Sequence, residues 1–171
     1  VVGKHVRAPG IDFSAGATLL ERGVVLGGAG LAAAAAAGRD TLTVARRPLI
    51  TVLGGGDEIV APGAEVQSDQ IFDCASFGVA GLAQGWGAAS TRGPILRDDV
   101  QLIASEIEKA WAASDLAVLI GGASVGDHDH AREAVDMLGA NVLFDKVSLR
   151  PGKPTWFALH GERTILGLPG N

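Results

Sequence analysis

From residue 48 onward, short apolar runs alternate with segments of helical periodicity. The run 115–120 (DLAVLI) is apolar after its first residue, as expected of a central parallel strand whose two faces are both covered. The segment 98–114 places Leu102, Ile103 and Ile107 on one face, together with Ala110 and Trp111, which predicts an amphipathic helix. Such alternation is typical of a three-layer α/β/α fold with a mostly parallel sheet. The expected strands are 49–53, 88–95, 115–120, 141–149, 155–159 and 163–168, the last two as a hairpin, and the expected helices are 74–86, 98–114 and 129–139.

Residues 1–46 differ from the rest of the chain. They contain two short apolar segments, the turn-rich stretch 7–16 and an alanine-rich stretch at 30–38 that favours a helix. Because these pieces lack a core of their own, we expect a partial second domain over 1–46, followed by the α/β domain over 47–171. Pro48 lies close to the boundary, since proline is tolerated at the first residue of a strand.

The composition limits the classes of function. The 171 residues carry a net charge of −5 and no tyrosine, which argues against a nucleic-acid partner, because such proteins need a basic face or stacking rings. No apolar run reaches the roughly 18 residues of a membrane-spanning helix, and no signal peptide is visible, so no membrane partner is expected. The single cysteine, Cys74, fits a reducing, cytoplasmic compartment, and we expect it to be a buried small apolar residue.

Polar or glycine-rich loops follow the expected strands of the α/β domain. They cover residues 54–59, 121–129, 150–154 and 169–171. Parallel strands bring such loops to one edge of the sheet, where ligands bind in this class of fold. The sequence therefore predicts a ligand site at the carboxyl ends of the strands.

The glycine pair Gly121–Gly122 follows the most apolar strand and lies shortly before a helix. Without side chains, the backbone N–H groups there could approach an anion, and the hydroxyl of Ser124 adds a donor. The alternative is a tight strand-to-helix turn with no ligand. Neither of the standard glycine-rich nucleotide-binding patterns is present.

Three cations, Lys146, Arg150 and Lys153, fall within eight residues of an acidic chain. Alternation along 145–153 would place Lys146 and Arg150 on one side of a strand, about 13 Å apart at ~3.3 Å per residue. This basic strip, Lys146–Lys153, suggests an oxyanion such as phosphate. The alternative is a solvated sheet edge on which lysines oppose aggregation.

Three acidic pairs lie at or near strand-to-helix connections, and carboxylates close to a phosphate suggest a bridging Mg²⁺. For Asp98 we favour helix capping, with Gln101 reaching back, over catalysis; for Asp129 we favour catalysis over capping. The histidines in 127–130 are interpreted as the start of a solvated helix rather than a transition-metal site. The pairs are Asp57 and Glu58, Asp98 and Asp99, and Asp127 and Asp129.

Several motifs together resemble one family. GDEI (56–59), GGASVGDHD (121–129), RPGKP (150–154) and GLPGN (167–171) stand in the order found in the molybdopterin molybdenumtransferases, the MoeA proteins, which are similar to the C-terminal domain of gephyrin. The resemblance implies a homodimeric enzyme that inserts molybdate into adenylylated molybdopterin, releases AMP and requires Mg²⁺. It also implies a MogA-like molybdopterin-binding domain over 47–171, a remnant of preceding domains over 1–46, and a further C-terminal β domain outside this sequence.

The resemblance also implies roles for individual residues. The catalytic residues would be Asp98, Asp129 and Lys146. The Mg²⁺ ligands would be Asp98, Asp99 and Asp129. The span of about 13 Å between Lys146 and Arg150, rather than the resemblance, assigns Lys146 to the organic ligand. Molybdate would be held by Ser124, Arg150 and Lys153. Pterin or nucleotide binding falls on Asp57, Glu58, Gly121, Gly122, Ser124, Pro169, Gly170 and Asn171.

The sequence departs from the family pattern in two places, and two other functions stay open. Gly54 and Gly55 stand where the family usually has hydroxyl side chains, and Ala75 where it often has asparagine. One alternative is a CinA-like pyridine-nucleotide hydrolase, although such proteins tend to carry GGLGPT and lack the RPGKP and LPGN pair. The other is a pterin-binding or scaffolding module without turnover.

Overall fold

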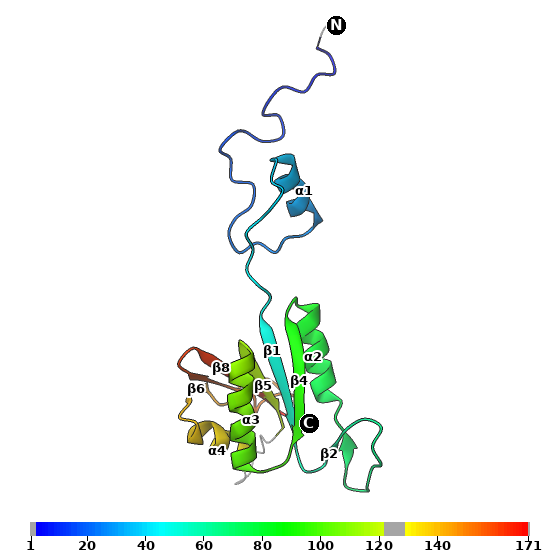
Figure 1. The fold of residues 1–171 in the computed structure, drawn as a ribbon, viewed down its shortest axis with the longest axis vertical. Coiled ribbons are helices and arrows are strands. Elements are labelled where there is room, and N and C mark those ends of the chain that lie inside the picture. Colours follow the sequence, from blue (N-terminus) through cyan, green and yellow to red (C-terminus); the bar gives the residue numbers. More distant parts are fainter. Residues whose placement is uncertain (1–2, 122–128, 171) are drawn as a thin grey trace. The chain divides into compact units, whose positions relative to one another are not determined.

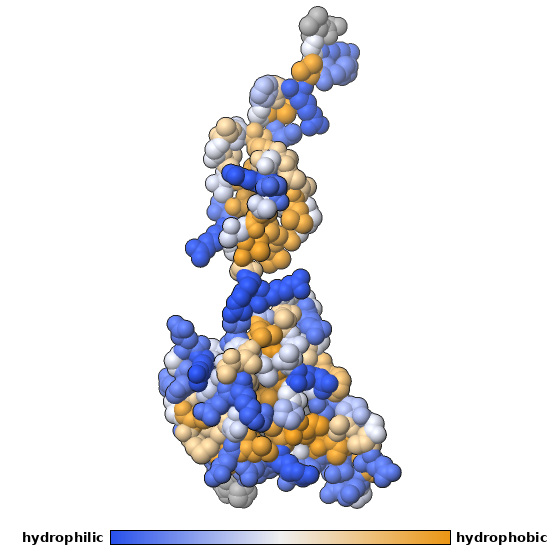
Figure 2. Space-filling view, in the orientation of Figure 1, coloured by the Kyte–Doolittle hydropathy of each residue, from blue (hydrophilic) through white to orange (hydrophobic). Residues whose placement is uncertain are grey.

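The computed structural model describes residues 3–121 and 129–170. The chain divides into two compact units, Val1–Ala45 and Arg46–Asn171 (Figure 1). In the first unit, helix α1 (Gly28–Ala36) is alanine-rich and buries only Ala34. Figure 2 shows the apolar surface that lies over this helix. The interpretation of residues 1–46 as a remnant of preceding domains stays a prediction.

The second unit is built on one six-stranded sheet. Its strands are β1 (Leu49–Gly55), β4 (Ala89–Leu96), β5 (Leu116–Ile120), β6 (Asn141–Phe144), β7 (Trp156–His160) and β8 (Arg163–Leu168). They lie in the order β4-β1-β5-β8-β7-β6. The pairs β1–β4, β1–β5 and β5–β8 are parallel, whereas β7 is antiparallel to both of its neighbours. The predicted, mostly parallel sheet and its β7–β8 hairpin are confirmed, and β6 runs in the direction of the parallel strands.

Helices cover both faces of this sheet, as predicted. They are α2 (Ala75–Gly85), α3 (Val100–Ala113) and α4 (His130–Met137). The larger core cluster joins α3 and α4 to side chains such as Leu53 and Leu119 on one face of the sheet. The next side chains along the same strands, Val52 and Val118, point to the other face and pack with Ala80 of α2. The fold is therefore a three-layer α/β/α arrangement (Figure 1).

The buried face of helix α3 largely follows the prediction, but its N-cap does not. Ile103, Ile107 and Trp111 are buried as expected, but Leu102 is exposed, because its position falls at the margin of the apolar face. The N-cap is Asp99, whose carboxylate accepts the N–H of Leu102 at 2.8 Å. The cap predicted at Asp98 is therefore wrong by one residue.

The segment after β6 also differs from the prediction. The strand expected over 141–149 ends at Phe144, and a loop follows in which the N–H of Val147 donates to the carbonyl of Lys153 at 3.0 Å. The loop folds back on itself, so strand alternation does not apply to Lys146 and Arg150. Proline and glycine at 151 and 152 interrupt extended pairing, and Gly152 has φ +109°.

Two short strands were not predicted. β2 (Ile59–Val60) and β3 (Ile71–Phe72) pair in parallel, apart from the main sheet. Each is two residues long, so neither leaves a recognisable alternation in the sequence. In the part of the chain that the structure describes, no helix has both the length and the apolar character needed to cross a bilayer.

Candidate functional site

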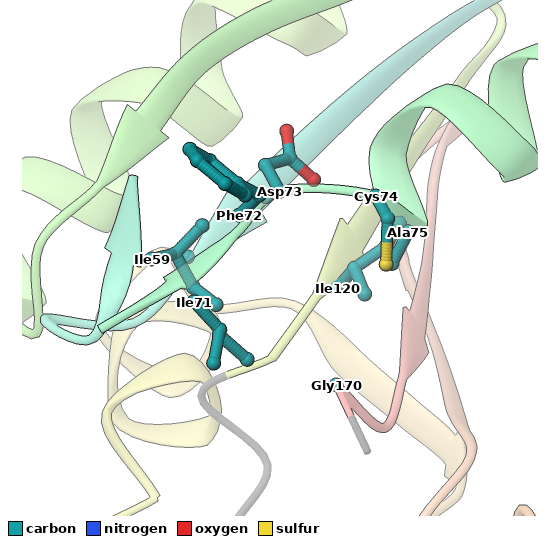
Figure 3. Close-up of a pocket in the computed structure, with 10 residues that line it drawn as sticks. Ile59, Ile71, Phe72, Asp73, Cys74, Ala75, Ile120 and Gly170 are labelled. Atoms are coloured by element: carbon teal, nitrogen blue, oxygen red, sulfur yellow. The ribbon is translucent and has the colours of Figure 1, made fainter. Parts of the chain in front are cut away.

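A pocket of about 50 Å³ lies at the carboxyl ends of β1 and β5. Figure 3 shows apolar side chains of β2 and β3 on one side of it, and the ends of β5 and β8 on the other. The backbone of Gly54 and Gly55 completes the wall. The pocket therefore lies at the sheet edge where the sequence predicted a ligand site. The lining residues are Gly54, Gly55, Ile59, Ile71, Phe72, Asp73, Cys74, Ala75, Ile120 and Gly170.

Gly121 is required by the close approach of two strand ends. Its φ is +86°, and a Cβ built there would overlap the carbonyl oxygen of Gly55. Its N–H donates to the carbonyl of Leu168 at 3.1 Å. That N–H is therefore engaged within the protein rather than offered to an anion. The alternative reading, a tight turn, accounts for this glycine, and ligand binding by Gly121 stays a prediction.

The end of β8 meets the end of β5 at the same place. A Cβ built at Gly170 would lie 3.2 Å from the Cα of Gly121, and Gly170 lines the pocket. Pro169 is half-buried beside it. The structure thus brings together two of the predicted binding loops, although Gly122, Ser124, Asp127 and Asn171 lie outside the described residues.

The loop after β1 contacts the turn before α3. The N–H of Gly56 donates to the carbonyl of Leu96 at 3.0 Å. The carboxylate of Asp57 accepts the N–H of Asp98 at 3.3 Å and lies 3.8 Å from the guanidinium of Arg97. Two of the predicted acidic pairs therefore lie next to each other. Both Asp57 and Glu58 are exposed to solvent.

Asp129 is the N-cap of α4. Its carboxylate accepts the N–H of Arg132 at 3.0 Å. Burial raises the pKa of Asp129, and the hydrogen bond and the positive charge from Arg132 oppose this rise. The structure thus shows the capping role that the sequence analysis ranked second, and a catalytic role for Asp129 stays a prediction.

The predicted Mg²⁺ ligands do not form one cluster. Asp99 and Asp129 each cap a different helix. Among the residues that the structure describes, no three carboxylate, histidine or cysteine side chains are close enough together to hold a metal ion. A site made only of Asp98, Asp99 and Asp129 is therefore not assembled. Mg²⁺ often takes one or two carboxylates together with substrate phosphates, and the adjoining Asp57 and Asp98 fit that donor set.

The basic strip lies on the loop after β6. Lys146, Arg150 and Lys153 are all exposed. Because β6 runs with the parallel strands, this loop leaves the sheet at the edge that holds the pocket. Two strands, β8 and β7, separate β6 from β5, so the strand ends are roughly 14 Å apart at ~4.8 Å per strand. The spacing of about 13 Å predicted between Lys146 and Arg150 assumed a strand through residue 149 and does not apply, because β6 ends at Phe144.

Asp73 is a pocket residue that the sequence analysis did not propose. Its buried carboxylate accepts from the N–H of Ser76 at 3.1 Å and from the hydroxyl of the same residue. It also lies 3.9 Å from the guanidinium of Arg92, which stacks on the ring of Phe77. A Cβ on Gly54 would meet this carboxylate at 3.6 Å. The signal in the sequence was the aspartate three residues before Ser76, a spacing typical of a helix start.

Cys74 was expected to be buried, and this prediction was wrong. Its side chain is exposed and lines the pocket. The residue precedes the first turn of α2, where it faces the pocket instead of the sheet (Figure 3).

Comparison with known proteins gives consistent matches. A family model described as "Probable molybdopterin binding domain" matches residues 51–171. A molybdopterin molybdenumtransferase of Nostoc sp. is 34% identical over 172 residues, covering 99% of this chain and 39% of the relative. Molybdopterin molybdenumtransferase 2 of Mycobacterium tuberculosis is 33% identical, covering 99% of this chain and 43% of the relative. The chain therefore spans about two fifths of these curated relatives.

A solved structure agrees with this match. The molybdopterin biosynthesis MoeA protein from Pyrococcus horikoshii superposes with a TM-score of 0.80 at 31% sequence identity. The superposition covers 94% of this chain and 40% of that protein. The fold and the order of the motifs thus both match those of MoeA proteins.

Proposed function

The chain belongs to the family of probable molybdopterin binding domains and is a homologue of the molybdopterin molybdenumtransferases, and we propose that it takes part in inserting molybdate into adenylylated molybdopterin, with release of AMP. We further propose that it does so within a longer, homodimeric, cytoplasmic protein. The chain spans 39% of the Nostoc relative, so the complete reaction is proposed for the longer protein.

The observation that carries this proposal is the meeting of three motif-bearing loops at one sheet edge. Asp57 lies against Asp98, Gly121 lies against Gly55, and Gly170 lies against Gly121. Loops that are far apart in the sequence thus meet at the carboxyl ends of the parallel strands. The pocket beside them is lined largely by apolar side chains and glycine backbone, a lining typical of small-molecule sites. At about 50 Å³ it is smaller than such sites usually are, so we propose that it takes only the edge of a flat ring such as a pterin or an adenine.

The chemistry we propose is positioning and charge neutralisation. Both molybdate and the phosphate groups of the organic substrate are anions. Lys146, Arg150 and Lys153 supply positive charge on one exposed loop, with Lys146 assigned to the organic ligand and the other two to molybdate. Ser124 would donate from the opposite loop. Electrostatic stabilisation of this kind acts without a covalent intermediate.

Acidic residues would serve the phosphate-bound metal ion. We propose Asp98 as a carboxylate ligand of Mg²⁺, with Asp57 beside it, because Asp99 and Asp129 cap two different helices and, among the described residues, do not cluster with them. These carboxylates would hold a Mg²⁺ ion whose charge offsets that of the substrate phosphates.

AMP release tests the proposal. The full-length protein is incubated with adenylylated molybdopterin, molybdate and Mg²⁺, and AMP is quantified. We expect release that depends on molybdate. Lys153→Ala should reduce it by about tenfold or more, because a charge-assisted contact is worth roughly 1.5–3 kcal/mol.

Lys109→Ala is the matched control. Lys109 is an exposed lysine on α3 that pairs with Glu106 at 2.6 Å, and loss of such a surface pair has little effect. Hydrolysis of pyridine nucleotides in place of AMP release would indicate the CinA-like function. Binding of the substrate without release would indicate a non-catalytic module.

A further inference from the structure

Two buried hydrogen-bond donors of the described residues have no acceptor. They are Nε1 of Trp156 and one terminal nitrogen, Nη1, of Arg132. Buried polar atoms are nearly always paired, and leaving one unpaired is costly, more so when it carries charge. Two such donors in one region therefore indicate an acceptor outside the described residues.

The two donors are neighbours on the same face of the sheet. The guanidinium carbon of Arg132 lies 5.8 Å from the centre of the Trp156 ring. Trp156 is only 2% exposed and pairs directly with Gly167 across β7 and β8. A Cβ on Gly167 would overlap the indole, including Nε1. Contact with the glycine backbone thus holds the ring in place, so its N–H keeps a defined position.

These donors lie at the edge of the sheet that carries the candidate site. Arg132 is in the first turn of α4, three residues after Asp129. Trp156 begins β7, which is antiparallel to β8, so its position coincides with the carboxyl end of the parallel strands. It directly follows the loop that carries Arg150 and Lys153. The pair therefore stands between two of the loops proposed to bind anions.

We propose that Arg132 and Trp156 together bind one tetrahedral oxyanion. A guanidinium and an indole offer only donors, and a ligand whose oxygens only accept is the complement of both. The positive charge of Arg132 favours an anion over water, because charge-assisted hydrogen bonds are the stronger ones. The identity of the ligand rests on the proposed function: either the phosphate of molybdopterin or molybdate has this chemistry.

The indole N–H signals provide a direct test. The chain has three tryptophans. Nε1 of Trp111 already donates to the carbonyl of Thr164 at 3.0 Å, and Trp86 is 81% exposed. In ¹⁵N-labelled chain, inorganic phosphate or molybdate should shift the Trp156 indole resonance and leave the other two in place. Trp156→Phe assigns the signal, and sodium chloride at equal ionic strength is the reference.

Arg132→Gln should weaken the anion affinity read from this shift by about tenfold. Arg163→Gln, which removes an exposed arginine at the opposite end of β8, should leave the affinity unchanged. The Trp111 resonance reports whether each variant remains folded. A response to phosphate alone or to molybdate alone identifies which oxyanion binds here.

A Trp156 resonance that ignores both anions would overturn the inference, as would unchanged affinity in folded Arg132→Gln. The outcome is separable from that of the proposed function. If the indole responds while the full-length protein releases no AMP, the proposed reaction fails and the oxyanion site stands. If AMP is released while the indole does not respond, the proposed reaction stands and the oxyanion site fails.

Discussion

Glycines at the candidate site differ in whether a side chain could replace their hydrogen atom. Gly121 combines a positive φ with a backbone oxygen in the space that a Cβ would need. Gly54 has neither constraint, since its nearest neighbour is the Asp73 carboxylate at an ordinary contact distance of 3.6 Å. The two positions therefore separate a glycine that the fold requires from one that it tolerates.

Gly121→Ala should lower the free energy of unfolding by about 2–4 kcal/mol, because it adds backbone strain and an overlap with Gly55. Gly54→Ala should change it by less than about 1 kcal/mol. Urea unfolding of both variants measures the difference. Similar losses in the two variants would show that the strand ends adapt to a Cβ at 121.

Gly167 should also be intolerant of a side chain. Its missing side chain makes room for the Trp156 indole, and both residues lie in the interior of the sheet. Gly167→Ala should cost about 1–3 kcal/mol through overpacking, measured by thermal or urea unfolding. Trp156→Phe combined with Gly167→Ala should recover part of this loss, because the smaller ring leaves space for a methyl group.

Helices and strands were largely predictable from their sequence patterns, whereas their ends were not. The apolar run of β5 and the buried face of α3 depend on local periodicity, which is visible in one sequence. The end of β6 at Phe144 and the two-residue strands β2 and β3 depend on tertiary pairing instead. For the same reason, the sequence placed Asp57 and Asp98 near a common edge but could not show that they touch, and it missed the buried Asp73.

The caps of α3 and α4 are each set by one aspartate. Asp99→Ala should lower stability by about 0.5–2 kcal/mol, because the N–H of Leu102 loses its acceptor. Asp98→Ala, one residue earlier, should have a smaller effect, since it keeps the backbone N–H that Asp57 accepts. Urea unfolding of the pair measures the contrast, and a larger loss at Asp98 would contradict the assigned cap.

Asp129→Asn tests the cap of α4 and its pH dependence together. The pKa of Asp129 is raised, mainly by burial, so the folded state binds a proton more tightly than the unfolded state does. This contribution makes stability fall as pH rises from the usual aspartate pKa near 4 through the folded value. Asparagine also caps helices, so the variant should keep its fold and lose this pH dependence. An unchanged pH profile of unfolding would contradict the assignment.

At the scale of the whole molecule, the two units differ in how much they bury. The second unit has two core clusters and a six-stranded sheet. It begins at Arg46, whose guanidinium pairs with the carboxylate of Asp115, and that carboxylate also accepts the N–H of Leu49 at 2.8 Å. The first unit exposes large apolar side chains, among them Val6, Val25 and Val44.

Hydrogen exchange should therefore separate the two units. Protection depends on how much free energy is needed to open a hydrogen bond, which is small where few apolar contacts support it. Amides of α1 rest on one buried alanine, whereas those of β1 and β5 lie in the centre of the sheet. We expect residues 3–45 to exchange orders of magnitude faster than these strands, in mass-spectrometric exchange of the 171-residue chain at one pH and temperature. Equal protection in both units would mean that residues 3–45 have support that their described contacts do not supply.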